Sequence, residues 1–167
     1  MGGKEYEGWV CLQNKFLLIR VIIMSISKKF MVAGKAIWTL GVPESFQKEK
    51  DSKPHYTFKV NKAKTGDMYF VNLLTGPDNM SDYTYVGMLN TSNGEVKLTK
   101  ASKLSSDSIC FRLLNRVMSR VWADEVTKIL EAGFTLHHEG RCGRCAKRLT
   151  TPESCEAGFG PECIHLV

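Results

Sequence analysis

The sequence lacks an uninterrupted apolar run long enough to cross a membrane. Its most apolar stretch, residues 16–24, is short and contains Arg20, whereas a spanning helix needs about 20 residues. The next segment, SISKKFMV, offers no small-residue cleavage site of the kind that ends a secretory signal. These absences favour a cytoplasmic protein with no membrane partner.

The chain also lacks internal repeats, heptad arrays and low-complexity tracts. With 167 residues, 43% of them hydrophobic, it is long enough for one packed domain with a small appendage. Acidic residues are the scarcer charge, 17 Asp and Glu against 23 Lys and Arg, which gives a net charge of +6. A basic balance favours an acidic partner such as nucleic acid, although many ordinary proteins share it.

The six cysteines do not indicate a disulfide framework, because four of them fall in the last 26 residues with the spacing of a metal site. Cys142 and Cys145 form a Cys-x-x-Cys pair flanked by glycines, and 17 residues separate Cys145 from Cys163. A tight turn of this kind points two thiolates at one ion. The sequence therefore predicts a closed structural Zn²⁺ site in a reducing compartment. Cys110 lies in an apolar helical run and is predicted to be a core residue.

The fourth zinc ligand is open on spacing alone. Cys155 would give C-x2-C-x9-C-x7-C, and His138 would give H-x3-C-x2-C-x17-C; His137 and His165 are further candidates. Pro161 fits the first turn of a helix, which would place Cys163 at its start. A knuckle followed by a ligand at a helix start is treble-clef-like.

The body is predicted to be α+β, with an antiparallel sheet of about four or five strands packed with one or two helices. Strand patterns cover residues 32–40, 55–60, 68–74 and 83–89, and Asn93-Gly94 is a strong hairpin signal. A helix capped by Ser106 or Asp107 carries the apolar stripe Ile109, Leu113, Leu114, Val117 and Val121. Gly133 is the expected stop of the helical region, before a short strand at 134–138.

We divide the chain into three parts. Residues 1–30 are an N-terminal extension, of which residues 1–23 are upstream sequence if Met24 is the native start. Residues 31–133 are the α+β body, and residues 134–167 are the zinc knuckle. No catalytic arrangement stands out, because Cys110 has no histidine partner in a recognisable motif and a closed zinc site has no open position. We therefore expect a protein that is not an enzyme.

Two basic clusters are candidates for nucleic-acid contacts, since cations that neutralise phosphates supply most nonspecific affinity. One belongs to the knuckle and the other forms an i, i+4 stripe on the helix. The alternative for both is an ordinary solvated surface. Tyr83 and Tyr85 share a strand face, where they either stack on unpaired bases or pack against a neighbouring element. The basic residues are Arg141, Arg144, Lys147 and Arg148 in the knuckle, and Arg112, Arg116 and Arg120 in the helix.

The blocks GRCGRCAKRLTTPES and GFGPEC, with TGPDNMSDYTYVG at residues 75–87, resemble a domain-of-unknown-function family common in bacteriophage and some bacterial genomes. The resemblance covers roughly residues 32–165 and implies His138, Cys142, Cys145 and Cys163 as zinc ligands, with Cys155 a local substitution. It supplies no activity.

These features together predict a small phage-type zinc-binding accessory protein of the bacterial or infected-host cytoplasm. It would bind nucleic acid or a nucleoprotein complex through its basic surfaces. The alternative is a protein-interaction module that inhibits or redirects a host protein.

Overall fold

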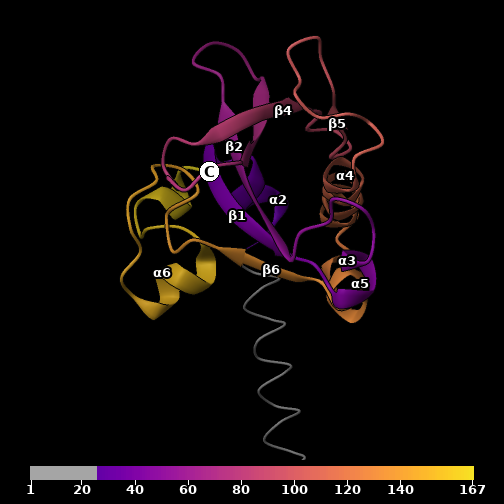
Figure 1. Cartoon of the computed structure of the whole chain (residues 1–167). Coiled ribbons are helices and arrows are strands. Elements are labelled where there is room, and N and C mark those ends of the chain that lie inside the picture. The colour runs from indigo at the N-terminus through magenta and orange to yellow at the C-terminus, as the bar shows by residue number, and fades with distance from the viewer. Residues whose placement is uncertain (1–25) are drawn as a thin grey trace, which may run out of the picture.

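The structure is a computed structural model that describes residues 26–167. The proposed start at Met24 and most of the predicted N-terminal extension lie outside the described residues. The described chain is α+β, as predicted: a curled antiparallel sheet with the strand order β5-β4-β3-β2-β1-β6, accompanied by a few helices (Figure 1).

The sheet has six strands rather than the predicted four or five. The additional member is β6 (Thr135–His138), which was predicted as a short strand at 134–138 but assigned to the knuckle. It pairs antiparallel with β1 and places Leu136 opposite Leu40. Leu136 is fully buried, and a backbone carried into the core needs hydrogen-bond partners, which β1 supplies. The other strands are β1 (Lys35–Gly41), β2 (His55–Lys62), β3 (Tyr69–Leu74), β4 (Tyr83–Leu89) and β5 (Val96–Lys97).

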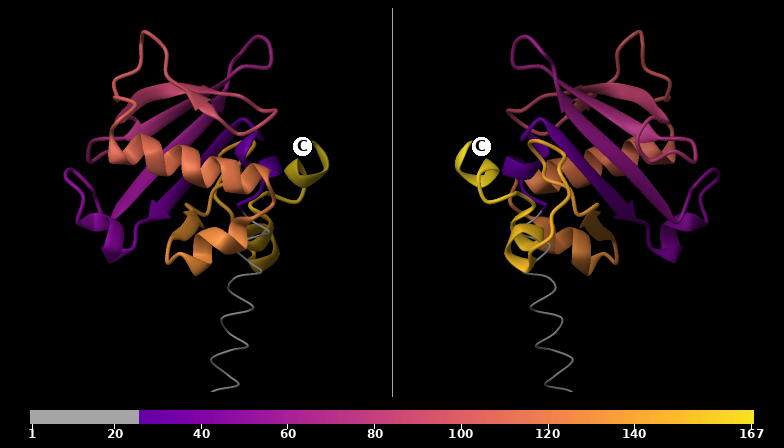
Figure 2. Two further views of the ribbon diagram at one scale, coloured as in Figure 1. Left: turned by 90° about the vertical axis from the view of Figure 1, so that its right-hand side faces the viewer. Right: turned by 90° about the vertical axis from the view of Figure 1, so that its left-hand side faces the viewer.

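One long helix, α4 (Ile109–Trp122), crosses one face of this sheet (Figure 2). Its N-cap is Ser108, whose hydroxyl accepts from the Phe111 N–H, and not Ser106 or Asp107. The cap lies later because Ser108 directly precedes the first buried residue, Ile109. The remaining helices are short: α2 (Lys28–Met31), α3 (Glu44–Gln47), α5 (Val126–Glu131), α6 (Pro152–Ala157) and the 3-10 helix η1 (Cys163–His165).

The hydrophobic core lies between α4 and the sheet. Alternation in β2 puts Tyr56, Phe58 and Val60 on the buried face. The predicted apolar stripe of α4 is buried against them, and Cys110 is buried in the same layer, which confirms its prediction as a core residue. Buried apolar area is what holds this part of the molecule together.

The hairpin signal at Asn93-Gly94 falls in a wider loop than a two-residue turn. Asn90 and Glu95 close it through a backbone hydrogen bond of 2.8 Å, and only Gly94 has a positive φ, +76°. A Cβ at Gly94 would lie 2.6 Å from the Trp122 ring, so glycine also permits the end of α4 to approach the loop.

The C-terminal segment packs on the body through α2. Phe30 is fully buried and contacts Phe159 edge-on, with ring centres 6.0 Å apart. The Lys35 N–H donates to the Gly143 carbonyl at 2.7 Å. Ile26 and Phe30, which fall within the predicted extension, are thus core residues. Across residues 26–167, none of the helices has both the length and the apolar character to cross a membrane.

Candidate metal centre

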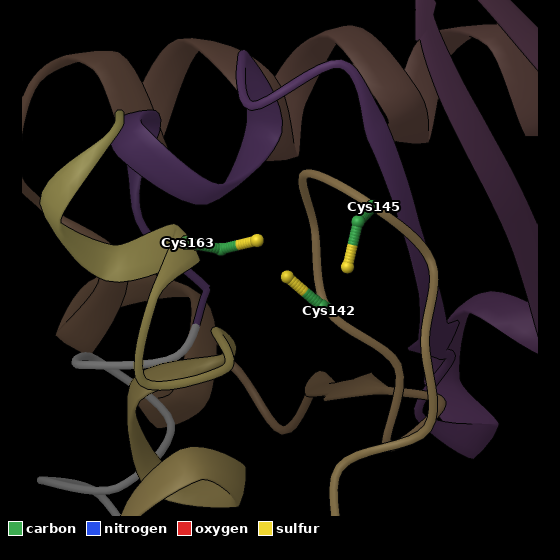
Figure 3. A group of neighbouring side chains, drawn as sticks. All are labelled: Cys142, Cys145 and Cys163. Carbon is green, nitrogen blue, oxygen red and sulfur yellow. The ribbon is translucent and has the colours of Figure 1, made fainter.

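Three cysteine thiols converge beside the body. The Sγ atoms of Cys142, Cys145 and Cys163 all lie within 4.8 Å of one another and can together hold a metal ion (Figure 3). Within residues 26–167 this is the single group of three or more His, Cys, Asp or Glu ligand atoms so close together. Cys142 is almost fully buried, and the other two are partly exposed.

A short hairpin places the first two thiols. Its arms meet at an isolated bridge between Arg141 and Arg148, and the Cys142 N–H donates to the Lys147 carbonyl at 2.8 Å. The chain reverses through a bond of 2.9 Å from the Ala146 N–H to the Cys142 carbonyl, with Ala146 at φ +64°. The hairpin therefore turns both Cys142 and Cys145 towards one point.

Gly143 is glycine for a packing reason. A Cβ there would lie 2.8 Å from the Phe30 ring. The predicted turn glycine is therefore also the point where the hairpin lies against the body.

The third thiol arrives through α6 and the GFGPEC segment. Thr151 caps α6 by accepting from the Ser154 N–H, and Gly158 ends it in the left-handed conformation, φ +73°. The Gly158 carbonyl then accepts from the Gly143 N–H at 3.0 Å, which ties this segment to the hairpin. Cys163 opens the 3-10 helix η1, as the proline pattern predicted.

The surroundings of the thiols shift their pKa values in opposite directions. Burial disfavours the Cys142 thiolate, but backbone N–H groups of Cys145, Gly160 and Arg144 outweigh it and bring the Cys142 pKa down to about 7. Burial and the neighbouring Cys145 and Cys142 thiols raise the pKa of Cys163. The Arg144 side chain acts in the opposite direction but does not outweigh them. N–H donors aimed at sulfur are the support that a metal-bound thiolate needs.

The structure does not bring His138 or Cys155 into the thiol cluster. His138 lies at the end of β6, where its Nδ1 accepts from the Gly140 N–H at 3.0 Å and its Nε2 lies 2.7 Å from the Cys155 carbonyl oxygen. Both ring nitrogens are thus engaged, and the imidazole links the hairpin to α6. Cys155 lies on α6, partly exposed.

The two predicted basic clusters have different surroundings. On α4, Arg112 pairs with Glu49, Arg120 pairs with Glu125, and the Arg116 guanidinium lies 5.6 Å from the centre of the Phe46 ring. No cation of the knuckle forms an ion pair with any acidic side chain in the described part of the chain. Arg144, Lys147 and Arg148 are exposed, and Arg141 donates to the Ala146 carbonyl at 3.2 Å.

Sequence reasoning missed the residues that support the centre from a distance. Phe30 lies in a segment that was assigned to an extension, and its contact with Gly143 joins residues far apart in the chain. The available signal was the apolar pair Phe30-Met31 directly after two lysines, which is typical of a short helix with one buried face.

Fold and site together define an α+β protein with a tri-cysteine centre on its C-terminal segment. Residues 136–166, which run from β6 through the tri-cysteine centre, match a family model described as "Family of unknown function (DUF6011)". No curated protein and no solved structure matches the chain.

Proposed function

We propose that the protein is a small zinc-binding accessory protein that binds nucleic acid or a nucleoprotein complex through the basic surface of its knuckle. The observation that carries this proposal is the position of Arg144, Lys147 and Arg148. They are exposed, free of ion pairs within the described residues, and carried by the hydrogen-bonded hairpin that also presents Cys142 and Cys145. Such fixed cations are suited to phosphate groups, whose neutralisation drives nonspecific nucleic-acid binding.

The donor set fits zinc. Thiolates select soft or borderline ions such as Zn²⁺, and a Cys-x-x-Cys turn with a distant third cysteine is a common structural zinc arrangement. The N–H groups of Cys145, Gly160 and Arg144 directed at Cys142 stabilise a thiolate there. When bound, the ion would join the hairpin to η1; the described residues would supply Cys142, Cys145 and Cys163 as ligands.

The family resemblance implies His138 as the fourth zinc ligand, but in the structure both ring nitrogens of His138 already have other partners. For His138 to join the thiols, its imidazole would have to give up its contact with Gly140 or with Cys155. We infer that His138 positions the hairpin against α6 and does not bind the ion. The His138→Ala variant should then keep one zinc per chain, and loss of zinc from this variant alone would restore His138 as a ligand.

Binding to random oligonucleotides over a range of salt concentrations tests the main proposal. The Arg144→Ala/Lys147→Ala variant should bind more weakly to all sequences, with a slope of log K against log salt smaller by about 1.4 to 1.8. The Lys48→Ala/Lys50→Ala variant removes the same charge from exposed residues of another loop and serves as the control. The zinc content of the two variants must be compared, because Arg144 also contacts Cys163 and its removal could weaken zinc binding as well as oligonucleotide binding. Absence of binding by the wild type at low salt would refute the proposal.

A second candidate function, interaction with a host protein, is favoured by a groove of about 590 Å³ beside α6 and η1. Apolar side chains contribute much of its lining, among them Leu149, Phe159 and Ile164, and exposed apolar hollows mark protein contacts. Ala157→Arg would place a charged chain in this groove. If the groove serves a host protein, this variant should lose any growth inhibition caused by expression in bacteria while it keeps oligonucleotide binding.

A further inference from the structure

The sheet has one face that no helix covers in the described part of the chain. Figure 2 shows α4 across one face and the strands exposed on the opposite side. Alternation in β3 turns Tyr69, Val71 and Leu73 to the buried side, while Phe70 and Asn72 point the other way and stay partly exposed. We call the surface over β2, β3 and β4 opposite α4 the open face.

Aromatic rings gather on this open face. The register pairs Tyr85 with Asn72 and Tyr83 with Leu74, so both tyrosines share the side of Phe70. The Phe70 and Tyr85 rings meet edge to face with centres 6.1 Å apart, and all three rings are partly exposed. The Lys59 ammonium lies 4.9 Å from the centre of the Tyr83 ring. The Phe70 and Tyr85 rings are partly accessible, whereas the Tyr83 hydroxyl is buried; burial, followed by the nearby Glu139 carboxylate, raises the pKa of Tyr83 to about 12.

A lysine-rich segment borders the same rings. Residues 96–104 contain three lysines and no acidic residue. The Lys103 N–H donates to the Tyr85 carbonyl at 3.3 Å, and the Thr99 hydroxyl bonds the Tyr85 hydroxyl at 3.4 Å, so this segment lies along the Tyr85 end of the open face. Lys100 and Lys103 are exposed.

Accessible rings beside lysines that form no ion pair within residues 26–167 match the chemistry of unpaired nucleotides. Bases stack on aromatic side chains and phosphates are neutralised by nearby cations, largely without regard to sequence. A duplex hides the faces of its bases and cannot use the rings. We propose that the open face binds single-stranded nucleic acid, with Tyr85 and Phe70 stacking on bases and Lys59, Lys100 and Lys103 contacting phosphates. This inference rests on the proposed function and assigns its substrate class.

The test compares fluorescence anisotropy of a labelled 20-nucleotide single strand with that of the matching duplex. Tyr85→Leu should weaken single-strand binding about tenfold, since stacking on one ring is worth about 1–3 kcal/mol, and Tyr85→Phe should retain binding. Lys100→Ala/Lys103→Ala should lower the salt slope by about 1.4. Lys48→Ala/Lys50→Ala is the matched control, because these lysines flank Glu49, which pairs with Arg112 of α4 on the opposite side of the sheet. Unfolding midpoints of all variants establish that they fold.

The outcomes separate this inference from the proposed function. If the open-face variants bind like Lys48→Ala/Lys50→Ala while Arg144→Ala/Lys147→Ala binds weakly, the open face is refuted and the knuckle proposal stands. If the duplex competes as well as the single strand, the assigned substrate class is wrong. If the wild type binds neither at low salt, both proposals fail.

Discussion

In the structure, the sheet strands β1 to β5 and α4 form the body, residues 35–122, and residues 139–167 form the C-terminal segment. The two regions differ in what lies at their centres. In the body, large side chains such as Trp38, Phe58 and Leu114 are fully buried between the sheet and α4. The C-terminal segment contributes just Cys142, Leu149 and Phe159 to the buried apolar set. So small a core cannot hold a segment of this length by apolar burial alone, and such segments use a staple. We propose that the staple here is a metal ion held by the three thiols.

The two regions also treat cysteine in opposite ways. Burial in the core raises the pKa of the Cys110 thiol to about 12, whereas the N–H groups around Cys142 bring its pKa down to about 7. The same residue type is therefore a small apolar side chain in one region and a prepared thiolate in the other. The contrast shows that surroundings decide the role of a cysteine, and removing one cysteine from each region tests it.

Cys145→Ser should have the largest effect. We expect loss of zinc and of order in residues 140–165, because structural zinc contributes roughly 10 kcal/mol or more of binding free energy. Elemental analysis and hydrogen exchange measure the two effects. Cys110→Ala is the control and should keep one zinc per chain; equal zinc in both variants would contradict the comparison.

Phe30→Ala should have the next largest effect, because this ring lies between the two regions. Its removal opens a cavity bordered by Phe159 and Gly143, and such truncations cost about 3–5 kcal/mol. Chemical unfolding should show lower stability, and competition with a chelator should show weaker zinc binding. A loss of stability without any change in zinc affinity would show that the two regions are not coupled through Phe30.

The free energy of unfolding should depend on pH in alkaline solution because of the buried Cys110 thiol. This thiol ionises near pH 9 in the unfolded chain and near 12 in the folded one, so the folded state binds more protons between these values. This contribution to stability is complete below pH 9 and declines as the pH rises. Between pH 8 and 10 the wild type should lose about 1.4 kcal/mol more than Cys110→Ala in urea unfolding. If the unfolding free energies of the wild type and Cys110→Ala fall in parallel as the pH rises, the pKa of Cys110 is not raised by burial and the prediction is wrong.

Arg112→Ala should have the smallest effect. Its pair with Glu49 is exposed, and exposed pairs are worth less than about 1 kcal/mol. Oligonucleotide affinity should stay close to wild type, in contrast to Arg144→Ala/Lys147→Ala. If Arg112→Ala loses as much affinity as Arg144→Ala/Lys147→Ala, the arginines of α4 belong to the binding surface after all.

The sequence predicted the parts of the fold that depend on local pattern. Alternation in β2, the apolar stripe of α4 and the glycine stop at Gly133 are local, and the structure has all three. The sixth strand was assigned to the knuckle because its pairing with β1 joins residues nearly a hundred positions apart, which no local pattern contains. The N-cap, Ser108, lies one or two residues after the predicted Ser106 or Asp107, because three serines and an aspartate precede the helix and each can cap it.

The candidate site also has features that local sequence spacing predicts and features that depend on tertiary packing. The spacing of Cys142, Cys145 and Cys163 was sufficient to predict that they converge. The engagement of both His138 nitrogens and the burial of Phe30 under Gly143 depend on how the hairpin packs. The ion pairs of the α4 arginines depend on acids from other segments, so the sequence could not separate these cations from those of the knuckle.

The central claim is that a metal on the three thiols holds the C-terminal segment while the apolar core holds the body. Hydrogen exchange of the zinc-loaded protein before and after addition of a chelator tests it most directly. We predict that amides of residues 140–165 lose protection while those of β1 to β4 and α4 keep theirs. Uniform loss of protection across both regions, or unchanged protection in residues 140–165, would contradict it.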